Sequence, residues 1–548
     1  MDNSFSDILR HESQPSDNIE FKKACCNLYL SIDASTKSDS EFNHHLITIY
    51  DSIKKFVQKI NNFHSHSKYI DSDILIQYQI IPNLFKLLEI RDDLDPSLVK
   101  EVLIALDRIL INIHPKDENI LFWQNSSLFS SLIALFQSFI IENDFSKDLP
   151  FQLQEVAKHF FILIGHLSDN HQQLFSFIPA DIFPGICNIV DDYFQTTSSL
   201  SLSALLFLYY FYGILSRENL SLIIQIIDTF INCINYVFSN DQYFSSKSSQ
   251  NSNIIDNNEN NYAKIEDFAL SGLYKIFTHF AIDNQEIIYI FIKNSYLEII
   301  CNIFSLPLFE PKPENSSENI DINSRVEHLY NIAIHLIGRI FTTFNPNKEL
   351  QVSQIIIGKS DETIKEEFLK MYQNLYQRIL DVFPQFFNSI SNTIVSTAIF
   401  QFGEVLTSNS LNNSDDDLFH YIQFLFSKIE NNSAEIIKTI YCTASKVISK
   451  MPQQFFQTLF TNPNLKDPFI SLLQNIFPIL IEPRDIVNFL QLMNAIINAS
   501  FLEGWNEMLL RVLNELDFLL HLDELMEIDY QFPDEILKLY NTIHDFFP

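Results

Sequence analysis

Glycine is scarce in this chain, which has only eight glycines among its 548 residues. No two of these glycines lie within ten positions of each other. Phosphate-binding loops and dinucleotide fingerprints need clustered glycines, because backbone amides must approach a phosphate group closely. The nucleophile elbow of a hydrolase needs two glycines beside its serine. The sequence therefore contains none of these motifs, and the shortage of glycine also disfavours a β-rich fold with many tight turns.

Basic residues are the second shortage, with 36 Lys and Arg against 68 Asp and Glu and a formal net charge of −32. Nucleic-acid binding requires clustered Lys and Arg that neutralise phosphates, and an anionic membrane surface attracts proteins through the same residues. We therefore predict no direct nucleic-acid binding and no attachment to such a membrane. A basic protein partner is compatible with this charge, although acidity by itself also keeps a protein soluble.

Cysteine pairs and long apolar runs are missing as well. The six cysteines include no Cys-x-x-Cys motif, so buried thiols in a reducing compartment are expected. The longest apolar run, Ala204–Leu215, is shorter than the about 20 residues that cross a bilayer as a helix. Residues 1–20 are polar and contain no signal-peptide core. These features predict a cytoplasmic and/or nuclear protein that is neither secreted nor inserted in a membrane.

Two short polar motifs carry residue types that bind metals. The histidines of His64–His66 have no third ligand nearby in the sequence. The aspartates of Asp71–Asp73 directly precede an apolar run, where a carboxylate caps the first amides of a helix and favours the positive end of its dipole. We predict a helix cap at Asp71, and no metal, cofactor or small-molecule substrate.

Apolar residues at helical spacing are what the chain has in abundance. Between residues 99 and 113 they recur at steps of three and four, which places them on one face of an α-helix. They are Val99, Val102, Leu103, Leu106, Ile109, Leu110 and Ile113. Charged residues such as Asp107 fall away from this face, His114–Asn119 breaks the helix, and Asn125–Ser127 offers capping oxygens to a second one. Two amphipathic helices cannot bury both their faces alone, so the unit needs neighbours, as in a solenoid.

The same pattern returns further along the chain. Helices are predicted to begin at Glu155 and at Glu266, and each is followed by an Asp-Asn turn. Between them, Leu202–Phe238 reads as another pair of helices with a polar break. The intervals are stretched by insertions relative to the repeat periods of about 40–47 residues that are typical of helical solenoids. The pattern favours a solenoid over a single irregular helical domain.

The acidic helix start, the Asp-Asn turn and the apolar helix that follows resemble the armadillo and related HEAT-like repeat superfamily. The resemblance covers roughly residues 70–345, and the remainder matches by helical pattern only. It implies an all-α fold, an armadillo/HEAT-like α-solenoid in which stacked helical repeats form a right-handed superhelix. Because the motif is degenerate, it supports the fold and barely constrains the function.

Composition divides the chain into four parts. Residues 1–20 are predicted to be a disordered tail, 21–238 an N-terminal helical-repeat half, and 263–548 a C-terminal helical-repeat half. Between the halves, residues 239–262 are rich in Ser and Asn and have too few apolar residues to order themselves, so we predict a flexible insert that proteases cut first. Helices are expected in the C-terminal half at 393–406, 418–429, 434–451, 469–480, 484–501 and 506–520.

The C-terminal end, residues 512–537, contains no Lys or Arg. Its acidic residues are Glu515, Asp517, Asp523, Glu524, Glu527, Asp529, Asp534 and Glu535. Terminal repeats need a polar outer face, so one interpretation is a solvated cap, and the other is a docking patch for a basic protein segment. One helical face, expected to lie against the core, is formed by Leu509, Val512, Leu513, Leu516, Leu519 and Leu520. The next apolar residues, Leu522, Leu525 and Met526, fall on nearly the opposite face, which predicts a break near His521.

A non-enzymatic, protein-binding scaffold is the predicted function, because no reactive motif survives and the resemblance is to interaction proteins. Two alternatives stay open, a divergent nuclear transport factor and a regulatory or scaffold subunit of a phosphatase or another enzyme. Importin-α-like adaptors repeat a Trp-x-x-x-Asn pair on successive repeats. The equivalent pairs here are Ile104 with Arg108, Lys158 with Ile162, and Ala269 with Leu273. The absence of this ladder argues against a conventional nuclear-signal adaptor.

Overall fold

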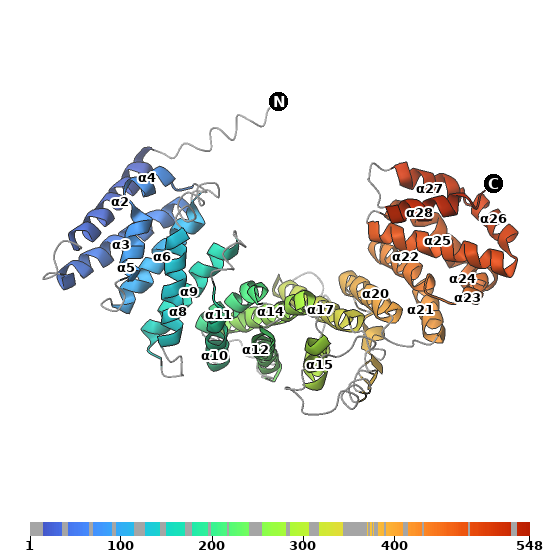
Figure 1. Ribbon diagram of the computed structural model, residues 1–548, viewed down its shortest axis with the longest axis horizontal. Helices are drawn as coiled ribbons and strands as arrows, with labels where there is room; N and C mark the ends of the chain where they lie inside the picture. Colours follow the sequence, from blue (N-terminus) through green and yellow to red (C-terminus); the bar gives the residue numbers. More distant parts are fainter. Residues whose placement is uncertain are drawn as a thin grey trace. The chain divides into compact units, whose positions relative to one another are not determined.

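The computed structural model is almost entirely helical in its described part (Figure 1). It describes residues 15–35, 42–64, 69–89, 95–113, 126–142, 149–169, 178–194, 199–215, 219–239, 255–280, 285–305, 317–343, 382–387, 391–408, 415–429, 432–480, 483–527 and 534–547, with a few single positions between 366 and 389. Within these ranges the only β-type pairing is an isolated bridge between Ile70 and Ile113, where the Ile70 amide donates to the Asn112 carbonyl over 2.8 Å. The predicted all-α fold is confirmed.

The chain divides into two compact units, Met1–Ile276 and Phe277–Pro548, which we call the N-terminal and C-terminal units. The division falls inside helix α14 (Ile255–Phe280). Helix α14 also begins within the insert that the sequence predicted at 239–262, while residues 240–254 lie outside the described part of the chain. The flexibility of that insert stays a prediction.

Helices of the N-terminal unit pack in a regular order. One layer runs α2, α3, α6, α9, α11, in which each helix packs on the next, and a second layer with α5, α8, α10 and α12 covers it. The bounds are α2 (Pro15–Ser35), α3 (Phe42–His64), α4 (Ser72–Gln77), α5 (Ile80–Glu89), α6 (Pro96–Asn112), α8 (Ser126–Glu142), α9 (Phe151–Asp169), α10 (Phe183–Tyr193), α11 (Ser199–Phe211) and α12 (Leu220–Ser239). This stacking of helices in two layers is the arrangement expected from the sequence.

Aromatic rings fill the centre of the N-terminal unit. Phe136 of α8 is fully buried, and its ring centroid lies 5.6 Å from that of Phe160, 5.3 Å from that of Phe161 and 5.6 Å from that of Phe207. These rings come from α8, α9 and α11, so they hold the two layers together. The seven residues predicted to face inward between 99 and 113 are all buried. Helical periodicity therefore identified the packed face of α6 correctly.

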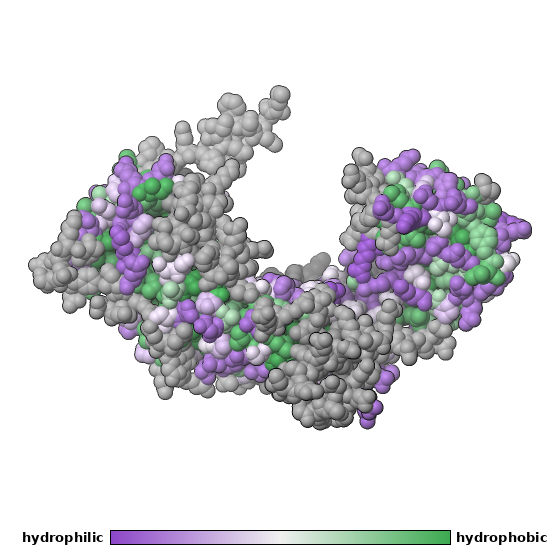
Figure 2. Space-filling view, viewed as in Figure 1, coloured by the Kyte–Doolittle hydropathy of each residue, from purple (hydrophilic) through white to green (hydrophobic). Residues whose placement is uncertain are grey.

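Helices of the C-terminal unit form a layer in the order α17, α20, α22, α25, α28, again with each helix packed on the next (Figure 1). The bounds are α15 (Gln285–Lys293), α16 (Tyr296–Cys301), α17 (Ser317–Thr343), α20 (Asn392–Thr407), α21 (Asp415–Ser427), α22 (Ala434–Ile448), α23 (Gln453–Thr461), α24 (Pro463–Asn475), α25 (Pro483–Glu503), α26 (Asn506–Glu515), α27 (Phe518–Glu527) and α28 (Asp534–His544). Helix α21 packs against α22 and α24, and α23 packs against α24 and α25. Hydrophilic residues cover much of the visible face of this unit (Figure 2).

Two glycines allow close approach of helices within this layer. A Cβ atom at Gly338 of α17 would overlap the amide end of Gln401 of α20, and one at Gly403 of α20 would overlap the methyl group of Thr443 of α22. A side chain at either position would therefore force neighbouring helices apart. These contacts bring the exposed faces of α17, α20 and α22 close together, which matters for the site described below.

Several helix boundaries differ from those predicted. Helix α2 begins at Pro15, inside the predicted tail, α9 begins at Phe151 rather than Glu155, and α14 begins well before Glu266. The C-terminal break occurs at Asp517, whose φ of 48° ends one helix and redirects the next, rather than at His521. The predicted breaker at 114–119 and the capping residue Asn125 lie outside the described residues.

The cap predicted at Asp71 is confirmed. Its Oδ1 atom accepts a hydrogen bond from the Asp73 amide over 3.0 Å, and Asp71 is the N-cap of α4. Replacing Asp71 with alanine leaves that amide without its partner, so we expect the free energy of unfolding to fall by about 0.5–2 kcal/mol. Asp51→Ala, an exposed mid-helix change, should stay within about 0.5 kcal/mol. Urea titration followed by circular dichroism compares the two, and equal effects would contradict a capping role.

Two described stretches are long and apolar enough to cross a membrane, judged by length and composition alone. They are Leu220–Val237 in α12 and Arg484–Glu503 in α25. Half of each stretch is buried against the rest of the chain. A core helix of a folded domain has the same composition, so these stretches are weak evidence for a membrane span.

Candidate functional site

The acidic residues predicted at the C-terminal end lie on helices α26, α27 and α28. The exposed ones are Glu515, Asp517, Glu524, Glu527 and Asp534. Asp523 is half-buried, whereas Asp529 and the side chain of Glu535 lie outside the described residues. We call the six described side chains the acidic end. Helix α25 packs against both α26 and α28, and α26 packs against α27, so the structure gathers these carboxylates on neighbouring helices.

Two members of the acidic end are held by local hydrogen bonds. The Tyr540 hydroxyl of α28 donates to Asp523 Oδ1 of α27 over 2.8 Å, and His521 Nδ1 lies 3.1 Å from Glu524 Oε2. Burial and this bond to Asp523 together raise the pKa of Tyr540. Within the described residues, no Lys or Arg pairs with any carboxylate of the acidic end. The exposed carboxylates of the acidic end therefore have no Lys or Arg counter-charge among the described residues.

The leucines of this region are placed differently from the prediction. Leu509 and Leu513 are buried as expected, but Leu516 is only half-buried and Leu520 is 58 % exposed. The turn at Asp517 rotates α27 relative to α26, so Phe518, Leu522 and Leu525 face the core instead. The prediction that Leu516 and Leu520 belong to the core is wrong.

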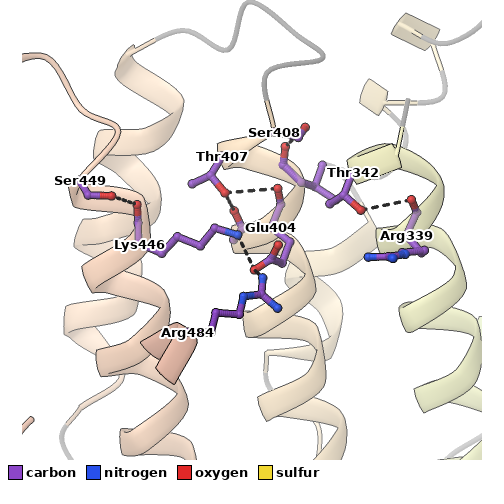
Figure 3. A network of polar contacts seen from close by, with 10 residues as sticks. Arg339, Thr342, Glu404, Thr407, Ser408, Lys446, Ser449 and Arg484 are labelled. Atoms are coloured by element: carbon purple, nitrogen blue, oxygen red, sulfur yellow. Dashed lines mark hydrogen bonds and ion pairs between the residues drawn. The ribbon is translucent and has the colours of Figure 1, made fainter. Parts of the chain in front are cut away.

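A second charged cluster, which the sequence did not reveal, lies on the exposed face of the C-terminal layer (Figure 3). Glu404 of α20 is 14 % exposed, and its Oε1 atom lies 2.5 Å from Lys446 Nζ of α22 and 2.7 Å from Arg484 Nη2 of α25. One carboxylate thus binds cations from two other helices. We call Glu404, Lys446 and Arg484 the three-helix cluster. Charge-assisted bonds of this length are roughly twice as strong as neutral ones, so they fix the relative positions of the three side chains.

Glu404 stabilises the charged form of Lys446. Burial lowers the pKa of Lys446, the charge of Glu404 and its hydrogen bond oppose this shift, and the net result is a pKa below the ordinary value. Arg484 and Lys450 add to the lowering because they repel a third cation.

A pocket of about 290 Å³ opens on the same face, beside the three-helix cluster. Its lining comes from α17, α20, α22 and α25 and includes His335, Ser396, Phe400, Lys438, Thr439 and Arg484. The guanidinium carbon of Arg484 lies 5.6 Å from the centre of the Phe400 ring, so the cation is held over an aromatic face as well as by Glu404. The pocket thus combines cations, hydroxyl groups and one aromatic ring.

The N-terminal unit carries a related arrangement on α6 and α9. Glu155 Oε2 of α9 lies 3.1 Å from Lys100 Nζ of α6, and its Oε1 lies 3.5 Å from Lys158 Nζ. Burial opposes ionisation of Glu155, but the two lysines outweigh it and lower its pKa. Burial and Lys158 lower the pKa of the adjacent His159 to about 4, so this imidazole is neutral at physiological pH.

Asp107 of α6 makes another polar contact between the same two helices. Its burial corrects the prediction that it lies away from the packed face. The residue is buried, and its Oδ1 atom lies 2.6 Å from Nδ1 of His166 on α9. The sequence placed Asp107 away from the packed face, because helical spacing cannot show that a neighbouring helix supplies a polar partner. The residue thus belongs to the contact between α6 and α9.

The described part of the chain contains no cluster of side chains typical of a metal centre. No three His, Cys, Asp or Glu side chains in it gather closely enough to hold a metal ion. All six cysteines are free, and burial raises the pKa of Cys25 and of Cys187 to about 12, which keeps these thiols protonated. Protonated thiols of this kind are poor nucleophiles.

Spacing along the chain held one faint signal of the three-helix cluster. Glu404 and Lys446 are 42 positions apart, and Lys446 and Arg484 are 38 apart. These intervals are close to one helical repeat, so the three residues stand on successive helices of the same layer. A search for charged residues at that interval would have proposed the cluster, although it could not have distinguished it from many other pairs.

Comparison with known proteins gives similarities of fold. No family model and no curated protein matches the chain. Among solved structures, a chain from work on the interaction between cadherin and beta-catenin shares 11 % identity, with 96 % of this chain and 85 % of that chain covered and a TM-score of 0.48. Kap95p, studied with RanGDP, shares 10 % identity over 98 % of this chain and 64 % of that one, with a TM-score of 0.44. A designed armadillo repeat protein in complex with the peptide (KR)4 shares 15 % identity over 57 % and 99 %, with a TM-score of 0.31.

These similarities concern the stacking of helices and not what this chain binds. The chain spans less than half the length of Kap121p, of which it covers 45 % at a TM-score of 0.38. The TM-scores of all four structures lie below 0.5. The layers of stacked helices in the described residues agree with the helical-repeat fold predicted from the sequence.

Proposed function

We propose that this protein is a non-enzymatic scaffold that holds a protein partner on the exposed faces of its stacked helices. The observation that carries this proposal is the fixed polar face of each unit, where Glu155 and Glu404 tie side chains of successive helices together. A surface whose long side chains are already ordered loses less conformational entropy on binding than a mobile one. Such faces suit the recognition of another protein.

The acidic end is the proposed docking surface for a basic segment of that partner. Its exposed carboxylates have no Lys or Arg partner in the described chain, so a basic segment would supply the missing counter-charges. Attraction between opposite surface charges mainly accelerates encounter and sets specificity. Because screening acts over about 8 Å at physiological ionic strength, the attraction should weaken steeply as salt rises.

A charge-reversal experiment tests this surface. Lysine is introduced at Glu515, Glu524 and Glu527, and association with an alternating Lys-Arg octapeptide is measured by stopped-flow fluorescence at low and high salt. The variant should associate about tenfold more slowly at low salt, and the difference should disappear at high salt, because steering is a long-range charge effect. Folding should be unaffected, since each change lies on an exposed position.

The matched control makes the same change of net charge elsewhere. Asp51, Glu89 and Asp467 are exposed residues on other helices, and their triple lysine variant should lose far less of the association rate. Equal losses for both variants would show that the peptide senses only the total charge of the chain. That result would reduce the acidic end to a solvated cap.

A further inference from the structure

The side chains of the three-helix cluster and of the pocket beside it carry an excess of positive charge, although the whole chain is strongly acidic. The pocket and the cluster together contain Lys438, Lys446 and Arg484 against Glu404 and Asp485, which leaves one positive charge in excess. His335 adds none, because burial lowers its pKa and its Nδ1 atom lies 2.7 Å from Gln401 Nε2. A local cation surplus on a chain of net charge −32 marks a place where the surface attracts an anion rather than a cation.

Some hydrogen-bond donors at this pocket are not used by contacts between the described residues. Arg484 has five N–H donors and its hydrogen bond to Glu404 uses Nη2, while its side chain stays 59 % exposed. Lys438 is exposed and makes no ion pair with a described residue. The Ser396 hydroxyl lines the pocket without a hydrogen-bond partner among the described residues, although it is shielded from solvent. A bound acceptor would satisfy this hydroxyl and remove the cost of leaving it unpaired.

We infer that this pocket binds a carboxylate side chain from an acidic segment of a protein partner. The single surplus charge matches one carboxylate better than a phosphate group, which carries about −1.5 to −2 charges. Arg484, already aligned by Glu404 and Phe400, would donate to the carboxylate, Lys438 would supply the second cation, and Ser396 or Thr439 would add hydroxyl donors. The pocket lies on α17, α20, α22 and α25, so this inference is independent of the acidic end.

Peptide binding tests the inference directly. Fluorescence anisotropy at physiological salt would compare three labelled octapeptides, built on Glu, on Gln and on phosphoserine within a Gln background. We expect the Glu peptide to bind and the Gln peptide to fail, because only the first carries the charge that the pocket lacks. Lys438→Gln should weaken binding of the Glu peptide several-fold, and Lys438→Gln with Arg484→Gln should weaken it about tenfold or more, as expected for loss of charge-assisted hydrogen bonds.

Controls separate the pocket from general charge and from misfolding. Lys466→Gln with Arg511→Gln removes two exposed cations from α24 and α26 and should leave binding of the Glu peptide unchanged. The single Lys438→Gln change breaks no described ion pair, so its effect cannot arise from loss of the three-helix cluster. Thermal melts of every variant verify folding.

Three results would overturn the inference. One is unchanged binding of the Glu peptide by both pocket variants, and another is equal weakening by the Lys466 and Arg511 control. The third is tighter binding of the phosphoserine peptide than of the Glu peptide, which would make this a phosphate site. Because the acidic end is tested with a basic peptide, either proposal can fail while the other stands.

Discussion

Replacing Phe136 with alanine is expected to lower the free energy of unfolding of the N-terminal unit by about 3–5 kcal/mol. The ring is fully buried and contacts three other rings, Phe160, Phe161 and Phe207, which come from the two neighbouring helices. Alanine would leave a cavity that rigid aromatic neighbours cannot fill, so both the transfer energy and the ring contacts are lost.

Hydrogen exchange followed by mass spectrometry can measure this loss within the intact chain. Amides of α8, α9 and α11 should exchange faster in the Phe136→Ala variant, while those of α22 and α25 in the other unit should keep their protection. Phe151→Ala removes the same ring from a position that is 72 % exposed and should change exchange very little. If the two variants behave alike, Phe136 does not hold the layers together.

The second large effect is expected at Glu404. Glu404→Gln keeps the shape of the side chain but leaves the Lys446 ammonium, which is 19 % exposed, beside Arg484 without a counter-charge. Breaking a buried ion pair costs about 3–5 kcal/mol, and we expect about 3 kcal/mol here because Arg484 is well solvated. Urea titration of the wild type and variant gives the difference in the free energy of unfolding.

A double variant distinguishes a stranded charge from simple loss of an attraction. Glu404→Gln with Lys446→Met removes both partners, and it should regain most of the lost stability because no uncompensated charge stays buried. The control pair is Glu435→Gln with Lys466→Met, on exposed positions of α22 and α24 outside the three-helix cluster, where we expect changes within about 0.5 kcal/mol each. Additive losses at Glu404 and Lys446 would contradict this account.

The dependence of stability on pH offers an independent test of the interaction between Glu404 and Lys446. The pKa of Lys446 in the folded chain lies below its ordinary value, so between the two values the unfolded chain binds more protons than the folded one. Stability contributed by this group therefore rises with pH in that window. Glu404→Gln should depress the folded pKa further, so the stability deficit of the variant should shrink as the pH approaches about 10.4, the ordinary value for lysine.

Helical periodicity predicted the packed faces well, because burial of an apolar stripe is a local property of one helix. The inward residues of α6 and the cap at Asp71 were both identified from neighbouring residues alone. Helix starts were predicted less well. Helix α2 extends back to Pro15 and α14 to Ile255 through polar residues that carry no apolar pattern, so only the structure shows that they continue the helix.

The candidate sites were predictable to different extents for the same physical reason, which is whether their residues are close together in the sequence. The carboxylates of the acidic end were visible because they lie close together in the sequence, and the change of apolar face predicted a break near His521, four residues beyond the turn at Asp517. The three-helix cluster could not be singled out from the sequence, because Glu404, Lys446 and Arg484 meet only when successive helices stack. Asp107 was misplaced for a related reason, since its burial depends on His166 from the next helix.

The close contact at Gly403 has a mechanical consequence. The Thr443 methyl group occupies the space that a side chain at position 403 would fill, so it resists sliding of α20 along α22. Shear of one helix along the other, even by a fraction of a turn of about 5.4 Å, would drive that methyl against a neighbouring side chain. Rocking about the contact meets no such barrier, because no Cβ stands at the pivot. Under load, this pair of helices should therefore be stiff to sliding and compliant to bending.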